Sequence, residues 1–360
     1  MRTAAAMILL LGLPALGNEE HLGPAPTRDQ YPINFQTLSY IPAAPDVLPF
    51  GRYEMDLQTV EANTLDYSGP IEVILAVPPP QRLAVTLAQA QAWGASISWF
   101  PVLYYFQMET NLTTFRLRTG LGNGWEASVT LPFFSAAGGF EDGLIENVHH
   151  TFGFHDVGRT SVQRDQVRVI LIKNGQVTYY SDRGVRPTML DPLLGLTHNL
   201  YESDRFAMAL NLQVKPPVTR DLYDARNGWD SALQFTGRWS PNASVDTYFG
   251  TGAVHRQSGS LLFNRDGFRD QLGIHAMVEG WRRGAWRPFY QLVYLTGTSY
   301  PVPQTMWSKP SLQQDLGLRW LCTPNLVFTF RYLKDITTND NTMEMGLIME
   351  ATWRFGAGRR

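Results

Sequence analysis

The chain has 360 residues, a formal net charge of −2, and a composition of 44% hydrophobic and 12% aromatic residues. Because so balanced a charge has no attraction for a polyanion, we expect no nucleic-acid partner. The mean hydropathy of −0.19 excludes a helical membrane protein, since transmembrane helices concentrate apolar residues, whereas alternating strands place a polar residue beside each apolar one.

Residues 1–17 have the pattern of a secretory signal peptide. Arg2 precedes an apolar run that ends at Ala15, Leu16 and Gly17, with small residues at the two positions that a signal peptidase reads. The alternative, an N-terminal membrane anchor, would need a longer apolar stretch, since about 20 residues cross a bilayer as a helix. We therefore predict that this peptide is cleaved after export.

Residues 18–50 are rich in proline and are predicted to form an extended periplasmic N-terminal lead-in, with a position in a barrel mouth as an open alternative. A first strand follows, because Tyr53, Met55 and Leu57 alternate with charged residues. Residues 62–111 form a long loop without regular alternation. The sequence leaves open whether this loop plugs a lumen or projects outward.

Residues 112–134 are predicted to form two strands joined by a tight turn at Gly120–Gly124. The strands alternate with a period of two, which gives each of them two different faces. One face is aromatic and aliphatic, and the other carries Arg116, Arg118 and Glu126. Such a hairpin needs apolar surroundings on one side and a wet interior on the other, as in an outer-membrane barrel, or the packed layers of a soluble β protein.

Residues 135–188 are predicted to form a long, partly helical extracellular loop cap. Within it, residues 141–152 place apolar side chains on one side of a helix. Asn174-Gly175 stands between two apolar runs and is a strong signal for a β-hairpin.

From residue 189 onward the alternation becomes regular. Further strands are predicted over residues 189–199, 205–215, 229–239, 244–254, 271–281, 286–296, 312–321, 326–334 and 343–355. Together with the three earlier strands they make an all-β, antiparallel transmembrane barrel of about 12 strands, with a range of about 10–14, because each is close to the length that a tilted strand needs to cross the hydrocarbon.

The predicted connections alternate strictly between short and long. Short turns fall at residues 120–124, 201–204, 240–242, 282–284 and 322–325, and longer ones at 62–111, 135–188, 216–228, 255–270, 297–311 and 335–342. Outer-membrane barrels have short periplasmic turns, long external loops and both chain ends in the periplasm. The count puts every short turn on the side of both termini, which favours such a barrel over a secreted soluble β protein.

Aromatic residues also cluster at the predicted strand ends, as in the interfacial girdles of membrane barrels. They are Trp125, Trp229, Trp239, Trp281, Trp286, Trp320, Trp353 and Phe355.

Several short motifs occur in an order and spacing typical of one bacterial family. They are Arg28-Asp29-Gln30-Tyr31-Pro32, Leu48-Pro49-Phe50-Gly51-Arg52, Gly120-Leu121-Gly122 with Trp125-Glu126, and Gly138-Gly139-Phe140 through Ile145-Glu146, His149, Phe152-Gly153 and Gly158-Arg159. On these motifs the chain resembles the family catalogued as domain of unknown function 3187, with a departure between Pro78 and Phe100. The resemblance implies an outer-membrane barrel and supplies neither an activity nor a catalytic residue.

Charged residues of both signs occupy the predicted inward face in equal numbers. The basic ones are Arg52, Arg116, Arg118, Lys215, Arg238, Arg287, Arg319, Arg331 and Arg354, and the acidic ones are Glu54, Asp56, Glu126, Asp230, Asp246, Glu279, Asp315, Glu344 and Glu350. A barrel of about 12 strands is narrower than open porins of about 16 to 18 strands, so paired charges would fill much of its lumen. These residues are candidates for a structural salt-bridge network or for the permeation path of a small solute.

Sites for a metal, a cofactor or catalysis have little support in the sequence. Glu146, His149 and His150 have a spacing that can place ligands on one helical face, but the signal is weak, and we predict no metal and no cofactor. A lipid hydrolase of the kind represented by outer-membrane phospholipase A, which uses a Ser/His/Asn set on the outer face of its barrel, would need a histidine beside a serine. No His-x-Ser motif occurs, and His255 and Ser258 are three residues apart.

The sequence therefore predicts a monomeric outer-membrane β-barrel over residues 51–355 with a tail at 356–360. Its expected partners are outer-membrane lipids and the barrel-assembly machinery. Its expected role is that of a narrow channel, or of a barrel that binds a small solute or lipid. The alternatives are an outer-membrane lipid hydrolase and a secreted soluble β protein.

Overall fold

A computed structural model describes residues 21–35, 37–76, 81–153, 158–219, 225–226, 228–257, 259–260, 269–297, 309–336 and 345–356. The predicted signal peptide, Glu344 and all but the first residue of the predicted C-terminal tail lie outside these residues.

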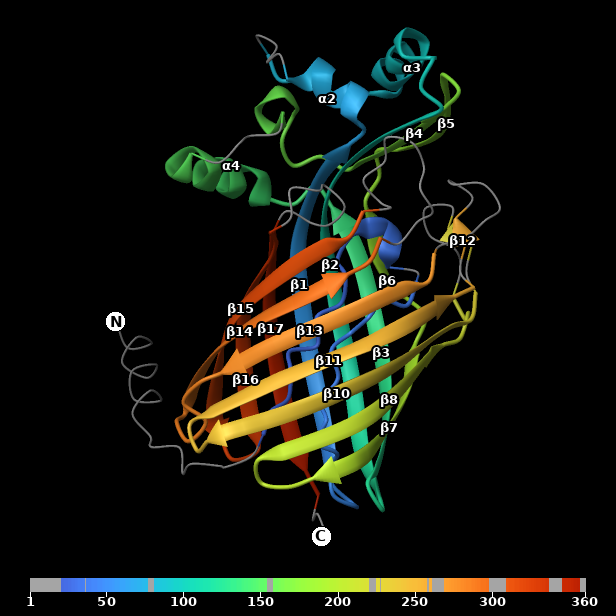
Figure 1. Cartoon of the computed structure of the whole chain (residues 1–360). Coiled ribbons are helices and arrows are strands. Elements are labelled where there is room, and N and C mark those ends of the chain that lie inside the picture. The colour runs from blue at the N-terminus through green and yellow to red at the C-terminus, as the bar shows by residue number, and fades with distance from the viewer. Residues whose placement is uncertain are drawn as a thin grey trace.

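Twelve antiparallel strands of the described chain close into a barrel (Figure 1). In order around it they are β1 (Tyr53–Tyr67), β2 (Val102–Gly122), β3 (Trp125–Ala137), β7 (Leu193–Glu202), β8 (Phe206–Lys215), β10 (Asp230–Asn242), β11 (Val245–Arg256), β13 (Gln271–Glu279), β14 (Trp286–Leu295), β15 (Ser311–Thr323), β16 (Leu326–Asp335) and β17 (Met345–Phe355). Because β17 pairs with β1 from Phe355↔Tyr53 onward, the sheet has no open edge in the barrel. The predicted fold class is confirmed.

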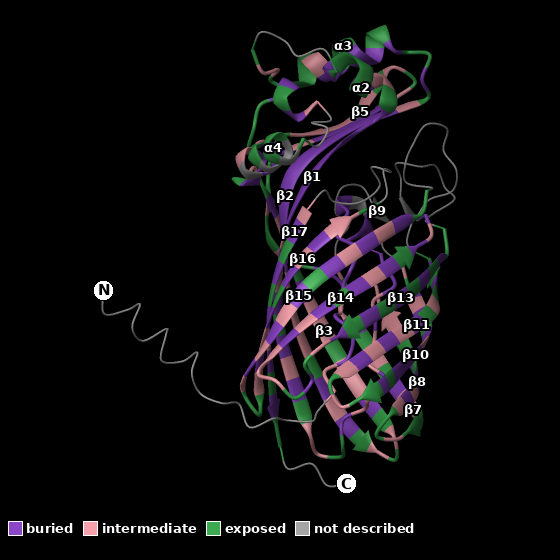
Figure 2. Cartoon of the chain, turned by 60° about the vertical axis from the view of Figure 1, so that its left-hand side comes forward, coloured by how far each residue is buried: buried purple, intermediate pink, exposed green. Residues whose placement is uncertain are grey.

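The barrel is apolar outside and polar inside, the inverse of a soluble protein. Along β13, the outward side chains of Leu272 and Ile274 are 58% and 53% exposed, whereas the inward side chains of Gln271, His275 and Glu279 are buried. A similar alternation runs along the other strands (Figure 2), apart from the upper ends of β1 and β2. Such an apolar outer band is suited to lipid, and its polar counterpart lines the lumen.

The short turns gather at one end of the barrel, opposite the helices (Figure 1). Of the predicted girdle residues, Trp353 and Phe355 lie at the C-terminal end of β17, beside the turn before Leu326, and all others except Trp229 lie within a few positions of these turns. Trp286 and Trp320 stack there with ring centroids 5.4 Å apart. The aromatic girdle is therefore concentrated at the short-turn interface, where amphipathic rings sit at the level of lipid headgroups.

The long-loop end carries a cap. Strands β4 (Arg168–Lys173) and β5 (Gln176–Ser181) extend the sheet beyond the upper part of β2, and β6 (Val185–Met189) pairs with β3. The helices are α2 (Gly69–Leu75), α3 (Leu87–Ser96), α4 (Glu141–Phe152) and the short η2 (Arg159–Ser161), and a separate two-stranded ladder joins β9 (Ala225–Arg226) and β12 (Gly259–Ser260). None of the described helices combines the length and the apolar character needed to cross a lipid bilayer.

The upper ends of β1 and β2 belong to the cap rather than to a loop. Residues 62–67 and 103–106 show no alternation because both of their faces are buried, by the cap helices on one side and the barrel top on the other. The loop at 62–111 thus projects outward as two long strands that carry α2 and α3. The helix predicted over 141–152 and the hairpin predicted around Asn174-Gly175 are both present.

The N-terminal segment, residues 21–50, lies inside the barrel. It ascends the lumen as far as Tyr31, turns through η1 (Pro32–Asn34) and descends again to Phe50, which bridges to Gly120 near the short-turn end. Tyr31, Phe35 and Tyr40 are almost completely buried. The segment predicted as a periplasmic lead-in is therefore a plug that passes through the lumen twice, because the polar wall offers partners that it would otherwise find only in water.

Candidate functional site

The barrel wall holds the backbone of the N-terminal segment through its inward side chains. Backbone N–H groups donate to side-chain oxygens from four different strands: Ala25 to Gln291 Oε1 (3.0 Å), Leu38 to Asp230 Oδ2 (2.9 Å), Tyr40 to Gln271 Oε1 (3.0 Å) and Leu48 to Glu126 Oε2 (2.9 Å). An extended chain outside any sheet still needs partners for its backbone donors when it is buried. The polar wall supplies them.

The ascending arm is fixed by a cluster on β14, β15 and β16. The Gln291 amide also donates to the Ala25 carbonyl oxygen (2.9 Å), so that it grips both backbone groups of one residue. Thr27 donates its hydroxyl to Asp315 Oδ2 (2.8 Å), and Arg331 Nη1 donates to the same carboxylate oxygen (2.7 Å). Charged donors and acceptors make these bonds stronger than neutral ones.

The descending arm packs against a wall position that has no side chain. Tyr40 lies against Gly273, where an added Cβ would stand 2.1 Å from the Tyr40 Cγ atom. The Tyr40 hydroxyl is 2.7 Å from His275 Nδ1, on the same inward face of β13. Lower down, Arg238 forms an ion pair with Asp46 (3.0 Å). The wall is therefore shaped to the segment as well as hydrogen-bonded to it.

An apolar layer lies at the top of the lumen. Tyr31 and Phe35, on either side of η1, pack with Tyr104, Phe106 and Phe134 of β2 and β3. The Phe35 and Phe134 ring centroids are 4.6 Å apart. Water and polar solutes cross such a layer poorly.

The predicted inward charges that the structure describes are buried or half-buried in the lumen, and they take different partners. Glu126, Asp230, Arg238, Asp246, Asp315, Arg319 and Arg331 contact the N-terminal segment directly. Arg116, Arg118, Lys215, Glu279, Arg287 and Glu350 form ion pairs with other residues of the barrel or its rim.

A dense ion-pair network joins the lower parts of β1, β2, β3 and β17. Arg118 binds Glu54 and also donates from Nε to Glu126 Oε1 (2.7 Å). Arg354 donates to the second oxygen of Glu54 (2.7 Å). Because removing one member of a buried pair leaves an uncompensated charge, such a network holds neighbouring strands in register.

A cavity remains between the N-terminal segment and the wall formed by β1, β2, β3, β7, β8 and β17. It encloses about 880 Å³ of empty space, part of it open to solvent. Arg28, Arg116 and Gln213 are among its lining residues. This space is the part of the lumen that the segment leaves unfilled on this side.

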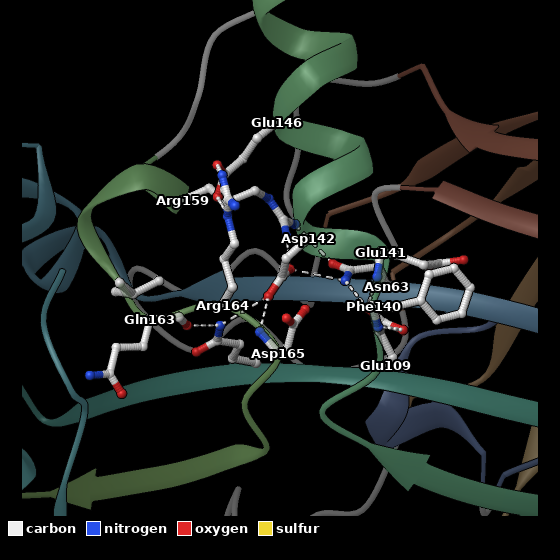
Figure 3. Close-up of polar contacts among 12 residues, drawn as sticks. Asn63, Glu109, Phe140, Glu141, Asp142, Glu146, Arg159, Gln163, Arg164 and Asp165 are labelled. Atoms are coloured by element: carbon white, nitrogen blue, oxygen red, sulfur yellow. Dashed lines mark hydrogen bonds and ion pairs between the residues drawn. The ribbon is translucent and has the colours of Figure 1, made fainter.

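A second polar cluster joins the cap to the barrel rim (Figure 3). Glu109 of β2 accepts the backbone N–H groups of Phe140 (2.8 Å) and Glu141, and so caps the N-terminus of α4. Asp142 accepts from Arg159 and from Asn63 Nδ2 (3.1 Å). The carboxylates near the helix start compensate its unpaired N–H groups and positive dipole end.

Glu146 is bound by arginines rather than by histidines. Burial by itself would raise the pKa of Glu146, but hydrogen bonds from Arg82 (2.7 Å) and Arg164 lower it to about 2. The His149 side chain lies outside the described residues. Within the part of the chain that the structure describes, no three His, Cys, Asp or Glu side chains are arranged to hold a metal ion.

Sequence reasoning missed the lumen groups that carry no charge or lie in the N-terminal segment. Gln271 and Gln291 stand mid-strand on the inward face, where a polar residue that can both donate and accept suits a backbone partner. Arg28 follows a proline-rich stretch. No alternation of polar and apolar residues there indicates that its side chain is buried. Gly273 interrupts the alternation of apolar and polar residues in its strand. A glycine within a strand often marks a place where another chain segment approaches the strand backbone closely.

The chain matches, over residues 77–355, the model of the family described as "Protein of unknown function (DUF3187)". The chain belongs to this family. No curated protein has a matching sequence. The resemblance seen in the sequence motifs is thus confirmed.

The fold is similar to that of the COG4313 outer membrane channel from Pseudomonas putida F1, with a TM-score of 0.51 and 11% identity over 88% of this chain and 100% of that one. Two porins are also similar: NanC (TM-score 0.43, 8% identity, 82% of this chain and 98% of that one) and KdgM (TM-score 0.41, 6% identity, 84% and 99%). At 11% identity the likeness to the COG4313 channel shows the fold alone, that of an outer-membrane β-barrel.

Proposed function

We propose that this member of the DUF3187 family is a narrow outer-membrane channel that its own N-terminal segment closes, and that a solute passes when the segment moves. The observation that carries the proposal is the double passage of residues 21–50 through the lumen, held by side chains of the wall. Each such hydrogen bond contributes about 0.5–1.5 kcal/mol net. The segment can therefore leave without breaking any pairing between barrel strands.

In this proposal the inward charges have two roles. Those that contact the segment, such as Asp230, Asp315 and Arg331, hold the closed state. Those that face the remaining cavity, such as Arg116, are candidates for contact with the solute. The COG4313 protein is described as a channel, and this supports the proposed class of function for a barrel of the same fold.

Planar-bilayer recordings test the proposal. The mature chain is compared with a variant that lacks residues 22–45, which removes both arms and leaves all barrel strands intact. We expect little or no steady current from the mature chain and a steady current from the variant. Heat-modifiable migration on gels shows that each protein has folded into a barrel.

Two results would contradict the proposal. A folded deletion variant that passes no current would exclude a channel, and the barrel would then serve a structural or binding role. A mature chain that conducts as well as the deletion variant would exclude closure by the segment.

We further propose that residues 1–17 are removed on export, that the barrel-assembly machinery inserts the barrel, and that the protein is monomeric and has no enzymatic activity. The intact mass of the protein from outer membranes tests the first point, since it should correspond to a chain that starts at Asn18. Sedimentation in detergent tests the oligomeric state, and release of fatty acids from phospholipid by purified protein would contradict the absence of lipid hydrolase activity.

A further inference from the structure

The cavity beside the N-terminal segment has walls of different chemistry. The segment contributes Arg28 and residues 41–44, and β2 contributes Arg116. β3, β7 and β8 contribute neutral polar side chains, among them Ser128 and Gln213. About 880 Å³ of empty space lies between these walls, part of it open to solvent.

Two guanidinium groups reach this cavity with donors to spare. Arg116 uses only Nε for Asp56 (2.7 Å), and no described residue accepts a hydrogen bond from its Nη atoms. Arg28 is buried and donates from Nη2 to the carbonyl oxygens of Phe35 (2.6 Å) and Thr37 (3.2 Å). Its Nε has no hydrogen-bond partner, and it forms no ion pair with any described residue. Asp29, Asp191 and Asp230 act on Arg28 only from beyond ion-pair distance, so an anion at closer range would lower the cost of burying its charge.

The carboxylates that line the same cavity are already used. Asp56 accepts from Arg116 and from the Thr352 hydroxyl (2.6 Å), and Glu126 accepts from Arg118 and the Leu48 N–H group. Glu350, the third lining carboxylate, accepts from Gln58 Nε2 (3.3 Å) and lies 3.7 Å from Arg331 Nη2. Each carboxylate therefore has partners of its own, whereas no described residue accepts from the Nη atoms of Arg116. An anionic acceptor suits these donors better than a cation does.

The opposite wall offers neutral groups. Gln213 donates from Nε2 to Asn211 Oδ1 (3.0 Å), and Asn211 donates in turn to the Thr197 hydroxyl (2.7 Å). At the end of this chain of bonds the Gln213 Oε1 atom is buried without a hydrogen-bond partner. An unsatisfied acceptor of this kind is matched by a hydroxyl group of a ligand.

We propose that this cavity binds a small organic carboxylate that carries hydroxyl groups. Its carboxylate lies on the Nη edge of Arg116, within the positive field of Arg28, and its hydroxyl groups face Gln213 and Ser128. Two parallel donors on one planar group suit a carboxylate particularly well. The inference rests on the proposed function in that the bound molecule is the solute which the channel passes.

Calorimetry on the intact mature chain in detergent tests the inference, with gluconate as the probe and glucose as its neutral counterpart. We expect gluconate to bind at least about tenfold more tightly than glucose, since a charge-assisted hydrogen bond is involved. Arg116→Gln should weaken gluconate binding at least about tenfold, and Arg116→Lys should also weaken it, because an ammonium group lacks the planar pair of donors.

Arg282→Gln is the matched control, since Arg282 is a buried arginine of the β13–β14 turn that pairs with Asp246 away from the cavity (3.4 Å). This variant should bind gluconate as the unaltered chain does. Equal binding of gluconate and glucose, or full binding by folded Arg116→Gln and Arg116→Lys, would overturn the inference. Because binding is measured at equilibrium without a current, its failure is distinct from a failure of the channel proposal, which the bilayer recordings decide.

Discussion

The fit of Tyr40 against Gly273 permits a direct test of how the N-terminal segment is held. In Gly273→Ala the new Cβ would stand 2.1 Å from Tyr40 Cγ and 2.6 Å from Tyr40 Cβ. Neither atom is the flexible end of a side chain, so the descending arm must shift. Overpacking of this kind costs about 1–3 kcal/mol, and at about 1.4 kcal/mol for each factor of ten the ratio of released to seated segment should rise about 5- to 150-fold.

Two measurements follow this change. Limited proteolysis in detergent should cut within residues 21–50 of Gly273→Ala sooner than in the unaltered chain, and bilayer recordings should show more frequent openings. Gly280→Ala is the matched control on the same strand pair, because its Cβ would meet no atom closer than 3.9 Å. If Gly273→Ala and Gly280→Ala resist protease equally, the seating of Tyr40 on the wall does not hold the segment in place.

Three further predictions concern the lipid face and the cap. Leu316→Arg, on the exposed outer face near the middle of β15, should lower the free energy of unfolding by about 2–4 kcal/mol, the cost of an arginine near the bilayer midplane. Denaturant titration in lipid vesicles measures this, and an unchanged midpoint would exclude lipid contact. Burial, with Glu109 and Glu61 nearby, raises the pKa of Glu141 to about 7, which is above its value in the unfolded chain. The stability that protonated Glu141 gives to α4 is therefore complete below about pH 4.5, and it is lost as the pH rises through about 7. Hydrogen-exchange protection of residues 141–152 should therefore be lower at pH 8 than at pH 5, and Glu141→Gln should remove the difference; equal protection at both pH values in the unaltered chain would contradict the argument. Glu109→Ala should destabilise α4 by about 1 kcal/mol because it removes the N-terminal cap, which the same exchange measurement detects, and unchanged protection would show that the cap contributes nothing.

The strands of the barrel could be predicted from the sequence because lipid and lumen impose opposite demands on neighbouring residues. The inward charged residues, among them Arg118, Glu126 and Asp315, could be predicted for the same reason, since the charges of every strand lie on its one polar face. The alternation of short and long connections predicted that the first strand begins, and the last strand ends, on the side of the short turns, as the pairing of Tyr53 with Phe355 and Thr119 shows. These signals are local, and each repeats in many strands.

The N-terminal plug and the upper parts of β1 and β2 could not be predicted in this way. Residues 103–106 are buried on both faces, so alternation, the main signal for a strand, is absent there. Residues 21–50 have no regular structure beyond η1, and their burial depends on acceptors such as Gln271 and Gln291, which lie more than 200 positions later in the chain. A pattern of neighbouring residues in the sequence cannot indicate a hydrogen-bond partner so far along the chain.

The course of the N-terminal segment also determines how it can be withdrawn. His21 lies beside Asp246 at the start of β11 (2.9 Å), and Phe50 bridges to Gly120 near the β2–β3 turn, so both ends of the segment leave the lumen through the same opening. The segment is therefore a returning loop rather than a thread. A retraction toward the short-turn side would draw no free end through the pore, and it would take Tyr31 and Phe35 out of the apolar layer beneath the cap at its first step.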